Sequence, residues 1–259
     1  MATLVHLIKQ LNTLQQLNSL HAVVQSIERQ QQFIEDFARD NRLLAEFYAD
    51  AISQELAWRG WFIAGSLHPH QFQPLARALK MKEEDQIEEF LKIHVRGIVS
   101  DVRKSVMKCW QKRAPILADA FDAHIAGKYT LSVPVLLAQA DGISADLLGA
   151  YLFTNQSGSI TKAASKAIKN HLPERPLAKS FLGLLLKASG LRLDTRKRDD
   201  LATSGLIFSS LNRHGVLHGL DCDYATEANS LRGIALISFM EWVAQVIHIK
   251  EKSPTSVST

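Results

Sequence analysis

The sequence predicts an all-α protein, and three observations lead to that prediction. Leucines recur every three or four residues from Leu4 to Leu17, which is the spacing of one face of a helix. Alternation of apolar and polar residues never persists for more than a few positions, and β-branched residues do not cluster, so no strand pattern is found. The 259 residues are 46% hydrophobic and 22% charged, which is ordinary for a globular chain of one large domain or two smaller ones.

The N-terminal part is expected to be helical as far as residue 60, because neither proline nor glycine occurs before Gly60. A long helical pattern that is rich in glutamine often packs in a bundle or against a second subunit, but an amphipathic helix of the same core explains it equally well. The prolines and glycines of 59–74 predict a connection. A helix is then expected over 83–110, with acidic residues at its start and basic residues at its end, as the helix dipole favours.

The rest of the chain is also expected to be helical. Residues 113–129 predict a helix that closes at Gly127, and residues 131–153 predict a strongly apolar helix with Pro134 near its first turn. Further segments follow, namely a basic helix over 160–171, an apolar stretch over 177–190 and a closing helix over 227–250.

Several classes of protein are disfavoured by composition. No run of 18 apolar residues lacks polar breaks, so we expect no membrane span, and the N-terminus does not have the pattern of a signal peptide. Two cysteines, Cys109 and Cys222, form no disulfide framework, which suits a reducing cytoplasm. The net charge of +4 permits a polyanionic partner such as RNA without requiring one.

Residues 211–219, LNRHGVLHG, contain the residue types needed to cleave RNA. Arg213 and His218 are five positions apart and would diverge by about 140° on a regular helix, but Gly215 and Gly219 are expected to relax the backbone and bring them together. An arginine grips phosphate with two parallel hydrogen bonds, and a histidine exchanges protons near neutral pH. Because the 2′-hydroxyl of RNA is an internal nucleophile, these two groups suffice for cleavage without a metal.

This motif resembles that of a known family. Arg213-x4-His218, in the setting NRHGVLHG, is similar to the R-x4–6-H motif of the HEPN superfamily, an all-α group. The group includes many metal-independent endoribonucleases of toxin–antitoxin, abortive-infection and other antiphage systems. The resemblance covers roughly 113–250. In many members the polar residue beside the arginine lies inside the motif, whereas here Asn212 precedes Arg213 and His214 follows it.

The resemblance implies a fold, an activity and partners. It implies a HEPN-like helical bundle over 113–252, preceded by an N-terminal helical region of unknown role over 1–112 and followed by a disordered tail over 253–259. The expected activity is metal-independent cleavage of RNA in antiphage defence or a toxin–antitoxin system, with no cofactor. The expected assembly is a cytoplasmic homodimer, in which two motifs face each other across a cleft, with an antitoxin or another defence protein as partner.

The resemblance also implies roles for individual residues. His218 would be the general acid or base, and Arg213 would hold the scissile phosphate. Asn212 and His214 would orient the substrate or the motif itself. Asp141 would either pair with Arg213 or fix a histidine tautomer, unless it simply ends a helix before Gly142.

Two further residues, Tyr224 and Glu227, are candidates to line the same pocket. The alternative is that this region starts the last helix, with Asp223 or Thr226 as its cap. The basic stretches 162–171 and 192–200, which lie upstream of the motif, would either neutralise RNA phosphates or form solvated faces.

Other functions compete with RNA cleavage. His214 and His218 are spaced like two ligands of a metalloprotease, but Gly215 stands where that motif has its glutamate, and a third ligand would have to come from residues 221–223. We therefore expect no metal site. A second alternative is a non-catalytic HEPN-like module that binds a nucleotide or a partner. A purely structural helical protein would be favoured if Arg213 and His218 were buried and far apart.

Overall fold

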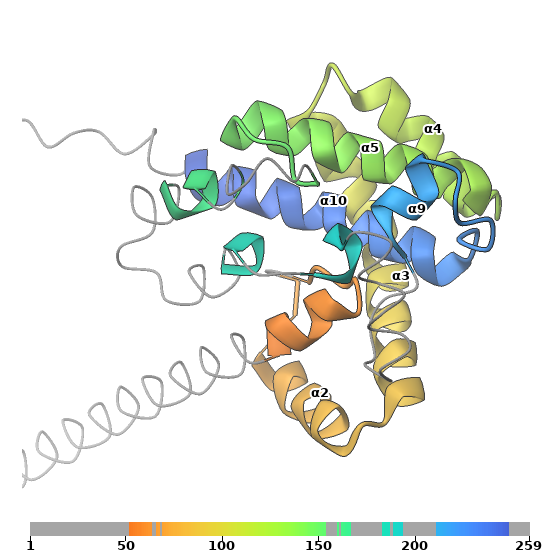
Figure 1. The fold of residues 1–259 in the computed structure, drawn as a ribbon, viewed down its shortest axis with the longest axis vertical. Helices are drawn as coiled ribbons and strands as arrows, with labels where there is room; N and C mark the ends of the chain where they lie inside the picture. The colour runs from red at the N-terminus through yellow and green to blue at the C-terminus, as the bar shows by residue number, and fades with distance from the viewer. Residues whose placement is uncertain are drawn as a thin grey trace, which may run out of the picture. The chain divides into compact units, whose positions relative to one another are not determined.

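The computed structural model describes 52–63, 66–67, 69–153, 160, 162–166, 183–186, 189–193 and 211–248. The prediction of an all-α fold is confirmed, since the regular elements of this part of the chain are all helices (Figure 1). The expected helices over 1–51 and the expected tail lie outside the described residues. The helices are α2 (Pro69–Met81), α3 (Glu84–Cys109), α4 (Ala114–Ile125), α5 (Tyr129–Leu148), α9 (Arg213–Leu217) and α10 (Glu227–His248), with short 3-10 turns η1 (Gly183–Leu186) and η2 (Gly190–Arg192).

Helices α3 and α4 follow the pattern expected from the sequence. Helix α3 begins with Glu84 and Asp85 and has Lys108 in its last turn, so its charges oppose the helix dipole at both ends. Its buried residues recur at three- and four-residue spacing, which makes one face apolar. Helix α4 is followed by Gly127, whose φ of 69° lies in the left-handed region that ends many helices.

The two most apolar helices, α5 and α10, form the centre of the fold. Helix α10 packs against both α5 and α3, and α4 packs against α5 (Figure 1). Gly233 of α10 allows the close approach to α5, because a Cβ at this position would lie 3.0 Å from the Leu136 side chain. Helices α5 and α10 are long and apolar enough to cross a membrane, and 83% of the apolar stretch of α10 is buried, as in a core helix.

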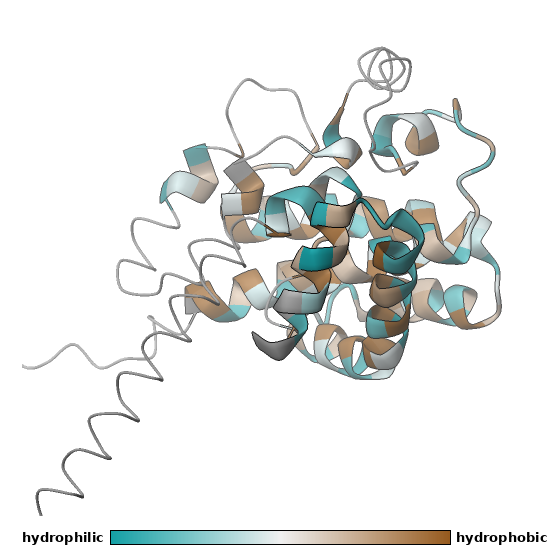
Figure 2. Cartoon of the chain, turned by 90° about the horizontal axis from the view of Figure 1, so that it is seen from below, coloured by the Kyte–Doolittle hydropathy of each residue, from teal (hydrophilic) through white to brown (hydrophobic). Residues whose placement is uncertain are grey.

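The outer helices have a more mixed surface. Figure 2 shows both hydrophobic and hydrophilic residues along each of these helices, as expected for helices that cover a core on one side. Most of the interior is apolar, although polar side chains such as Asn229 and Arg232 are also buried in it, and its largest fully buried side chains include Trp61, Phe121, Phe153 and Phe239.

Two expected boundaries are wrong. The connection predicted over 59–74 ends earlier, because α2 begins at Pro69 and contains Pro74. Proline fixes φ near the helical value, so it is accepted early in a helix although it donates no hydrogen bond. The helix predicted over 131–153 ends at Leu148, because Gly149 adopts a left-handed φ of 69°. Within 177–190, the described residues form 3-10 turns.

The chain divides into two compact units, Met1–Ala45 and Glu46–Thr259. The sequence suggested instead a boundary after residue 112. Residues 52–110 share one apolar core with α4, α5 and α10, and Leu56, Trp61 and Leu91 are almost completely buried in it. The described helices before residue 112, α2 and α3, are therefore part of the same packed unit as the motif.

Candidate functional site

The motif forms a short helix, α9, whose N-terminus is fixed by Asn212. The Oδ1 of Asn212 accepts a hydrogen bond of 2.9 Å from the Gly215 amide, the contact of an N-cap residue. Its Nδ2 donates to the carbonyl oxygens of Gly190 (3.3 Å) and Leu193 (2.8 Å). Because Asn212 is fully buried and saturated by backbone groups, it orients the motif and does not face a substrate.

The other end of α9 is closed by a tight turn. His218 is the C-cap, and Gly219 follows with φ of 70°. The amides of Leu220 and Asp221 both donate to the carbonyl of Gly215, at 2.8 and 3.0 Å. This hydrogen bonding satisfies a carbonyl that a helix end leaves without a partner.

Gly215 has a different role from the one expected. It was expected to relax the backbone, but it lies within regular helix, and only Gly219 has a left-handed φ. A Cβ on Gly215 would lie 1.9 Å from Oδ2 of Asp221, so glycine is needed here for close approach. Arg213 begins α9 and His218 is its C-cap, five residues later, a spacing at which side chains on a regular helix diverge by about 140°.

Arg213 lies against α5 and the segment that follows it. Its Nη2 is 3.7 Å from Oδ2 of Asp141, and its guanidinium is 5.9 Å from the centre of the Phe153 ring. The Nε of Arg213 is buried and has no hydrogen-bond partner among the described residues. The side chain retains 19% of its exposure. The guanidinium is thus held by charge and by an aromatic face, with hydrogen-bonding capacity to spare.

Asp141 is a buried residue in the middle of α5. It does not end a helix before Gly142, because α5 continues to Leu148. Its Oδ1 accepts a 3.0 Å hydrogen bond from the Phe153 amide, which leaves Oδ2 facing Arg213. Of the expected roles of Asp141, pairing with Arg213 therefore agrees with the structure. The 3.7 Å between Nη2 of Arg213 and Oδ2 of Asp141 is longer than a hydrogen bond. One carboxylate holds both the arginine and the aromatic ring beside it.

The two histidines of the motif lie on one face of α9. The rings of His214 and His218 stack with centroids 5.6 Å apart and planes 17° apart, as their spacing of four residues allows. His218 is exposed and His214 is partly buried. No group of three or more histidine, cysteine or acidic side chains is arranged to hold a metal within the part of the chain that the structure describes.

Tyr224 and Glu227 belong to the start of α10. The Tyr224 hydroxyl donates to the carbonyl of Thr130 at 3.2 Å. Glu227 forms a two-pronged ion pair with Arg96 of α3, at 2.9 and 3.0 Å, and the hydrogen bonds from Arg96 lower its pKa. Thr226 is the cap of α10, because its Oγ1 accepts from the Asn229 amide at 3.1 Å.

Some residues around the motif could not be found by sequence reasoning. Phe153 gave no signal beyond belonging to an apolar stretch, and Arg232 lies inside an apolar helix without a motif around it. The basic stretch 192–200 is described only at its first two residues. There Arg192 donates to the Leu185 carbonyl at 3.3 Å, and burial lowers the pKa of its guanidinium.

Comparison of the chain with protein-family models, with curated proteins and with solved structures found no match.

Proposed function

We propose that the protein is a metal-independent endoribonuclease of HEPN type that acts in bacterial antiphage defence or in a toxin–antitoxin system. The observation that supports this most is the state of Arg213. Its guanidinium has spare donors, and its nearest carboxylate lies 3.7 Å away, outside hydrogen-bonding range. An arginine in this state has a strong preference for a planar or tetrahedral anion such as phosphate.

The chemistry follows from what the two side chains do. The 2′-hydroxyl of a ribose attacks the adjacent phosphorus, the bond to the 5′-oxygen breaks, and a 2′,3′-cyclic phosphate is left. The 2′-hydroxyl loses a proton and the 5′-oxygen gains one; His218, whose exposed ring is accessible to RNA, carries out one of these transfers and water carries out the other. Arg213 offsets the charge that develops on the phosphorane.

A homodimer is part of the proposal. Arg213 begins α9 and His218 follows its last residue, and at this spacing on a regular helix the two side chains would diverge by about 140°. A single copy would then present them poorly to one phosphate. Two copies of α9 across a cleft would provide the arginine and the histidine of a composite site from both chains. The expected assembly is therefore a two-fold dimer with RNA between the motifs.

The test is cleavage of labelled RNA by the purified full chain in EDTA, with analysis of the product ends. Cyclic phosphate and 5′-hydroxyl ends are expected, and DNA should remain intact because it has no 2′-hydroxyl. His218→Ala should lower the rate about 10²–10⁴-fold, the usual share of acid–base catalysis. Arg213→Ala should be equally harmful, and Arg213→Lys should recover little, because lysine has no planar fork.

Arg113 provides a matched control. It also pairs with a carboxylate of α5, because its Nη2 lies 2.6 Å from Oδ2 of Asp146, but it is outside the motif. Arg113→Ala should leave cleavage within about twofold of wild type, as expected for a residue that contacts no reacting group. Equal losses in Arg113→Ala and Arg213→Ala would remove the argument for a specific phosphate contact, and strict dependence on a divalent metal would overturn the mechanism.

One observation favours the non-catalytic alternative, a HEPN-like module that binds a nucleotide or a partner. The Asp141 carboxylate shares the surroundings of Arg213 and offsets part of its charge. An arginine balanced in this way can bind an anion without accelerating a reaction. Wild-type protein that binds RNA or nucleotide through Arg213 but leaves the RNA intact would establish this alternative.

A further inference from the structure

The segment between α9 and α10, residues 219–226, is attached near its C-terminal end by hydrogen bonds of Tyr224 and Thr226, and one of these bonds comes from a buried side chain. The carbonyl of Tyr224 accepts a 2.9 Å hydrogen bond from Nδ2 of Asn229, in the first turn of α10. Asn229 is 1% exposed, so this contact is shielded from water. The segment is thus held near its end by a buried carboxamide and at its start by the carbonyl of Gly215.

The carboxamide of Asn229 is fixed in one orientation. Its Oδ1 accepts a 3.0 Å hydrogen bond from Nη1 of Arg232, which only donates, while its Nδ2 donates to a carbonyl, which only accepts. Both contacts require the same placement of oxygen and nitrogen. No aspartate or aliphatic side chain at this position can make both.

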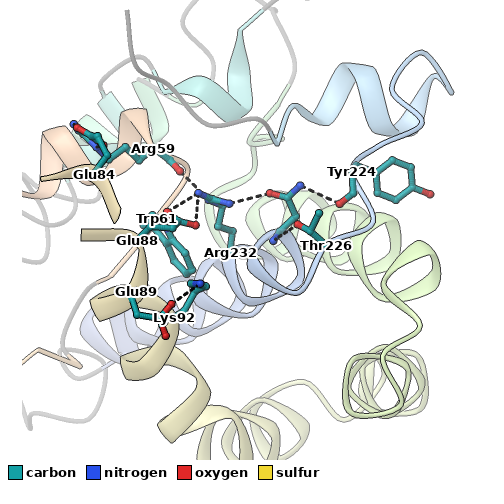
Figure 3. A network of polar contacts seen from close by, with 10 residues as sticks. Arg59, Trp61, Glu84, Glu88, Glu89, Lys92, Tyr224, Thr226 and Arg232 are labelled. Carbon is teal, nitrogen blue, oxygen red and sulfur yellow. Dashed lines mark hydrogen bonds and ion pairs between the residues drawn. The ribbon is translucent and has the colours of Figure 1, made fainter. Parts of the chain in front are cut away.

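Arg232 itself makes several polar contacts, which are drawn in Figure 3. Its Nη2 lies 2.8 Å from each carboxylate oxygen of Glu88 on α3, and its Nε donates to the carbonyl of Arg59 at 2.9 Å. Its guanidinium also lies 4.8 Å from the centre of the buried Trp61 ring. Burial lowers the pKa of Arg232, opposed by the charge of Glu88. A chain of contacts therefore runs from α3 and residues 59–61 to the Tyr224 carbonyl.

We propose that Asn229 is a positioning residue of the candidate site, through which buried Arg232, paired with the partly exposed Glu88, fixes 219–226 and, with it, the turn of α9 that carries His218. The catalytic part of this inference rests on the proposed function. The connection between Asn229 and the turn that carries His218 depends only on the fold. It explains why a polar chain runs through the apolar packing of α10 at the point where the helix begins.

The physical reason is the length of α9. A helix of five residues is far too short to persist without its caps. Its C-terminal turn depends on the Leu220 and Asp221 amides, which can donate to Gly215 only while 219–226 stays folded back on the helix. Release of that segment at Tyr224 would let these amides leave and would free the His218 ring from its stacked position.

The test replaces Asn229 by aspartate in the full chain. Asn229→Asp keeps the acceptor for Arg232 but sets a carboxylate oxygen against the Tyr224 carbonyl, so the side-chain bond from position 229 to the segment is lost while the bonds of the Tyr224 hydroxyl and of Thr226 remain. Amide hydrogen exchange over 219–226 should become about tenfold faster, as for the loss of one buried hydrogen bond. In wild type that cuts RNA, kcat should fall about tenfold with KM within about twofold, because positioning acts on the reaction step.

A spectroscopic measurement follows His218 without any need for activity. With labelled histidine, the ring signal of His218, assigned with His218→Ala, should shift in Asn229→Asp because its stacking on His214 changes. Glu89→Gln is the matched control, since Glu89 neighbours Glu88 on α3 and forms an exposed pair with Lys92. It should change neither exchange nor the His218 signal.

The outcomes separate this inference from the proposed function. Unchanged exchange over 219–226 and an unchanged His218 signal in Asn229→Asp would overturn the inference, whether or not the protein cuts RNA. Changed exchange with unaltered kcat in an active enzyme would overturn the positioning role. If wild type does not cut RNA, the proposed function fails, and the His218 signal alone decides the coupling. If Asn229→Asp does not fold, Glu88→Gln loosens Arg232 from the other side and should move the same signal.

Discussion

Replacement of Gly215 by alanine should have two opposite effects on the free energy of unfolding, a gain in helix propensity and a clash with Asp221. Gly215 lies inside α9, where alanine is intrinsically favoured over glycine by about 1 kcal/mol. The added Cβ, however, would lie 1.9 Å from Oδ2 and 2.3 Å from Cγ of Asp221. The 3.0 Å bond from its amide to the Gly215 carbonyl holds the Asp221 backbone close to the new Cβ, so the carboxylate would have to rotate away from it. Relief of such overpacking costs about 1–3 kcal/mol.

The cost of the clash should therefore exceed the gain in helix propensity. Subtracting the gain of about 1 kcal/mol from the middle of the range for the clash, Gly215→Ala should lower the free energy of unfolding by about 1 kcal/mol. Gly97 is the matched control, because it lies exposed within α3 and a Cβ there meets nothing within 4 Å. Gly97→Ala should raise the free energy of unfolding by about 0.5–1 kcal/mol through helix propensity alone. Urea unfolding followed by far-ultraviolet circular dichroism measures both changes.

A double-mutant cycle identifies the cause. Gly215→Ala should be much less harmful in the background of Asp221→Ala, which removes the atoms that the new Cβ would meet. Equal stabilisation by Gly215→Ala and Gly97→Ala, or a cycle without coupling to Asp221, would refute the reasoning that glycine at 215 is needed for close approach.

Three further predictions concern capping and pH. Thr226→Ala should lower the free energy of unfolding by about 1 kcal/mol, measured by urea unfolding, because it removes the cap of α10. Burial lowers the pKa of His124 below 6.5, so the unfolded chain takes up a proton first and stability should fall as pH drops below 6.5. That loss is at most about 1.4 kcal/mol per pH unit and should vanish in His124→Gln, whereas an unchanged slope would contradict the assignment. The hydrogen bonds from Arg96 lower the pKa of Glu227 below 4.5, so Glu227→Gln should flatten the separate loss of stability below pH 4.5 in acid-unfolding curves.

The sequence by itself was sufficient for the fold class and for most helices. Apolar residues at helical spacing, the acidic start of α3, Gly127 after α4 and the apolar content of α5 and α10 are local signals, and each was read correctly. Some helix boundaries were predicted wrongly. A proline such as Pro74 is accepted early in a helix, and a glycine such as Gly149 ends a helix only when its φ is left-handed.

The residue types of 211–219 were enough to identify the candidate site in the sequence. The positions of its side chains depend on contacts between segments that are distant along the chain. Asp141 had been one candidate partner of Arg213, but that Phe153 lies beside the pair follows from the packing of α9 against α5, which no local pattern records. The role of Gly215 was misread for the same reason, since the need for glycine arises from Asp221 across the turn and not from backbone freedom.

Local propensity and hydrophobic spacing are properties of neighbouring residues, and they determined that this chain is helical and which of its helices are buried. Tertiary packing alone decided that Asn212 is a saturated cap, that Glu227 is paired with Arg96, and that Asn229 joins the motif to a buried arginine. Polar side chains acquire such roles from the partners that the fold brings within hydrogen-bonding distance, and those partners lie from three to more than a hundred residues away along the chain.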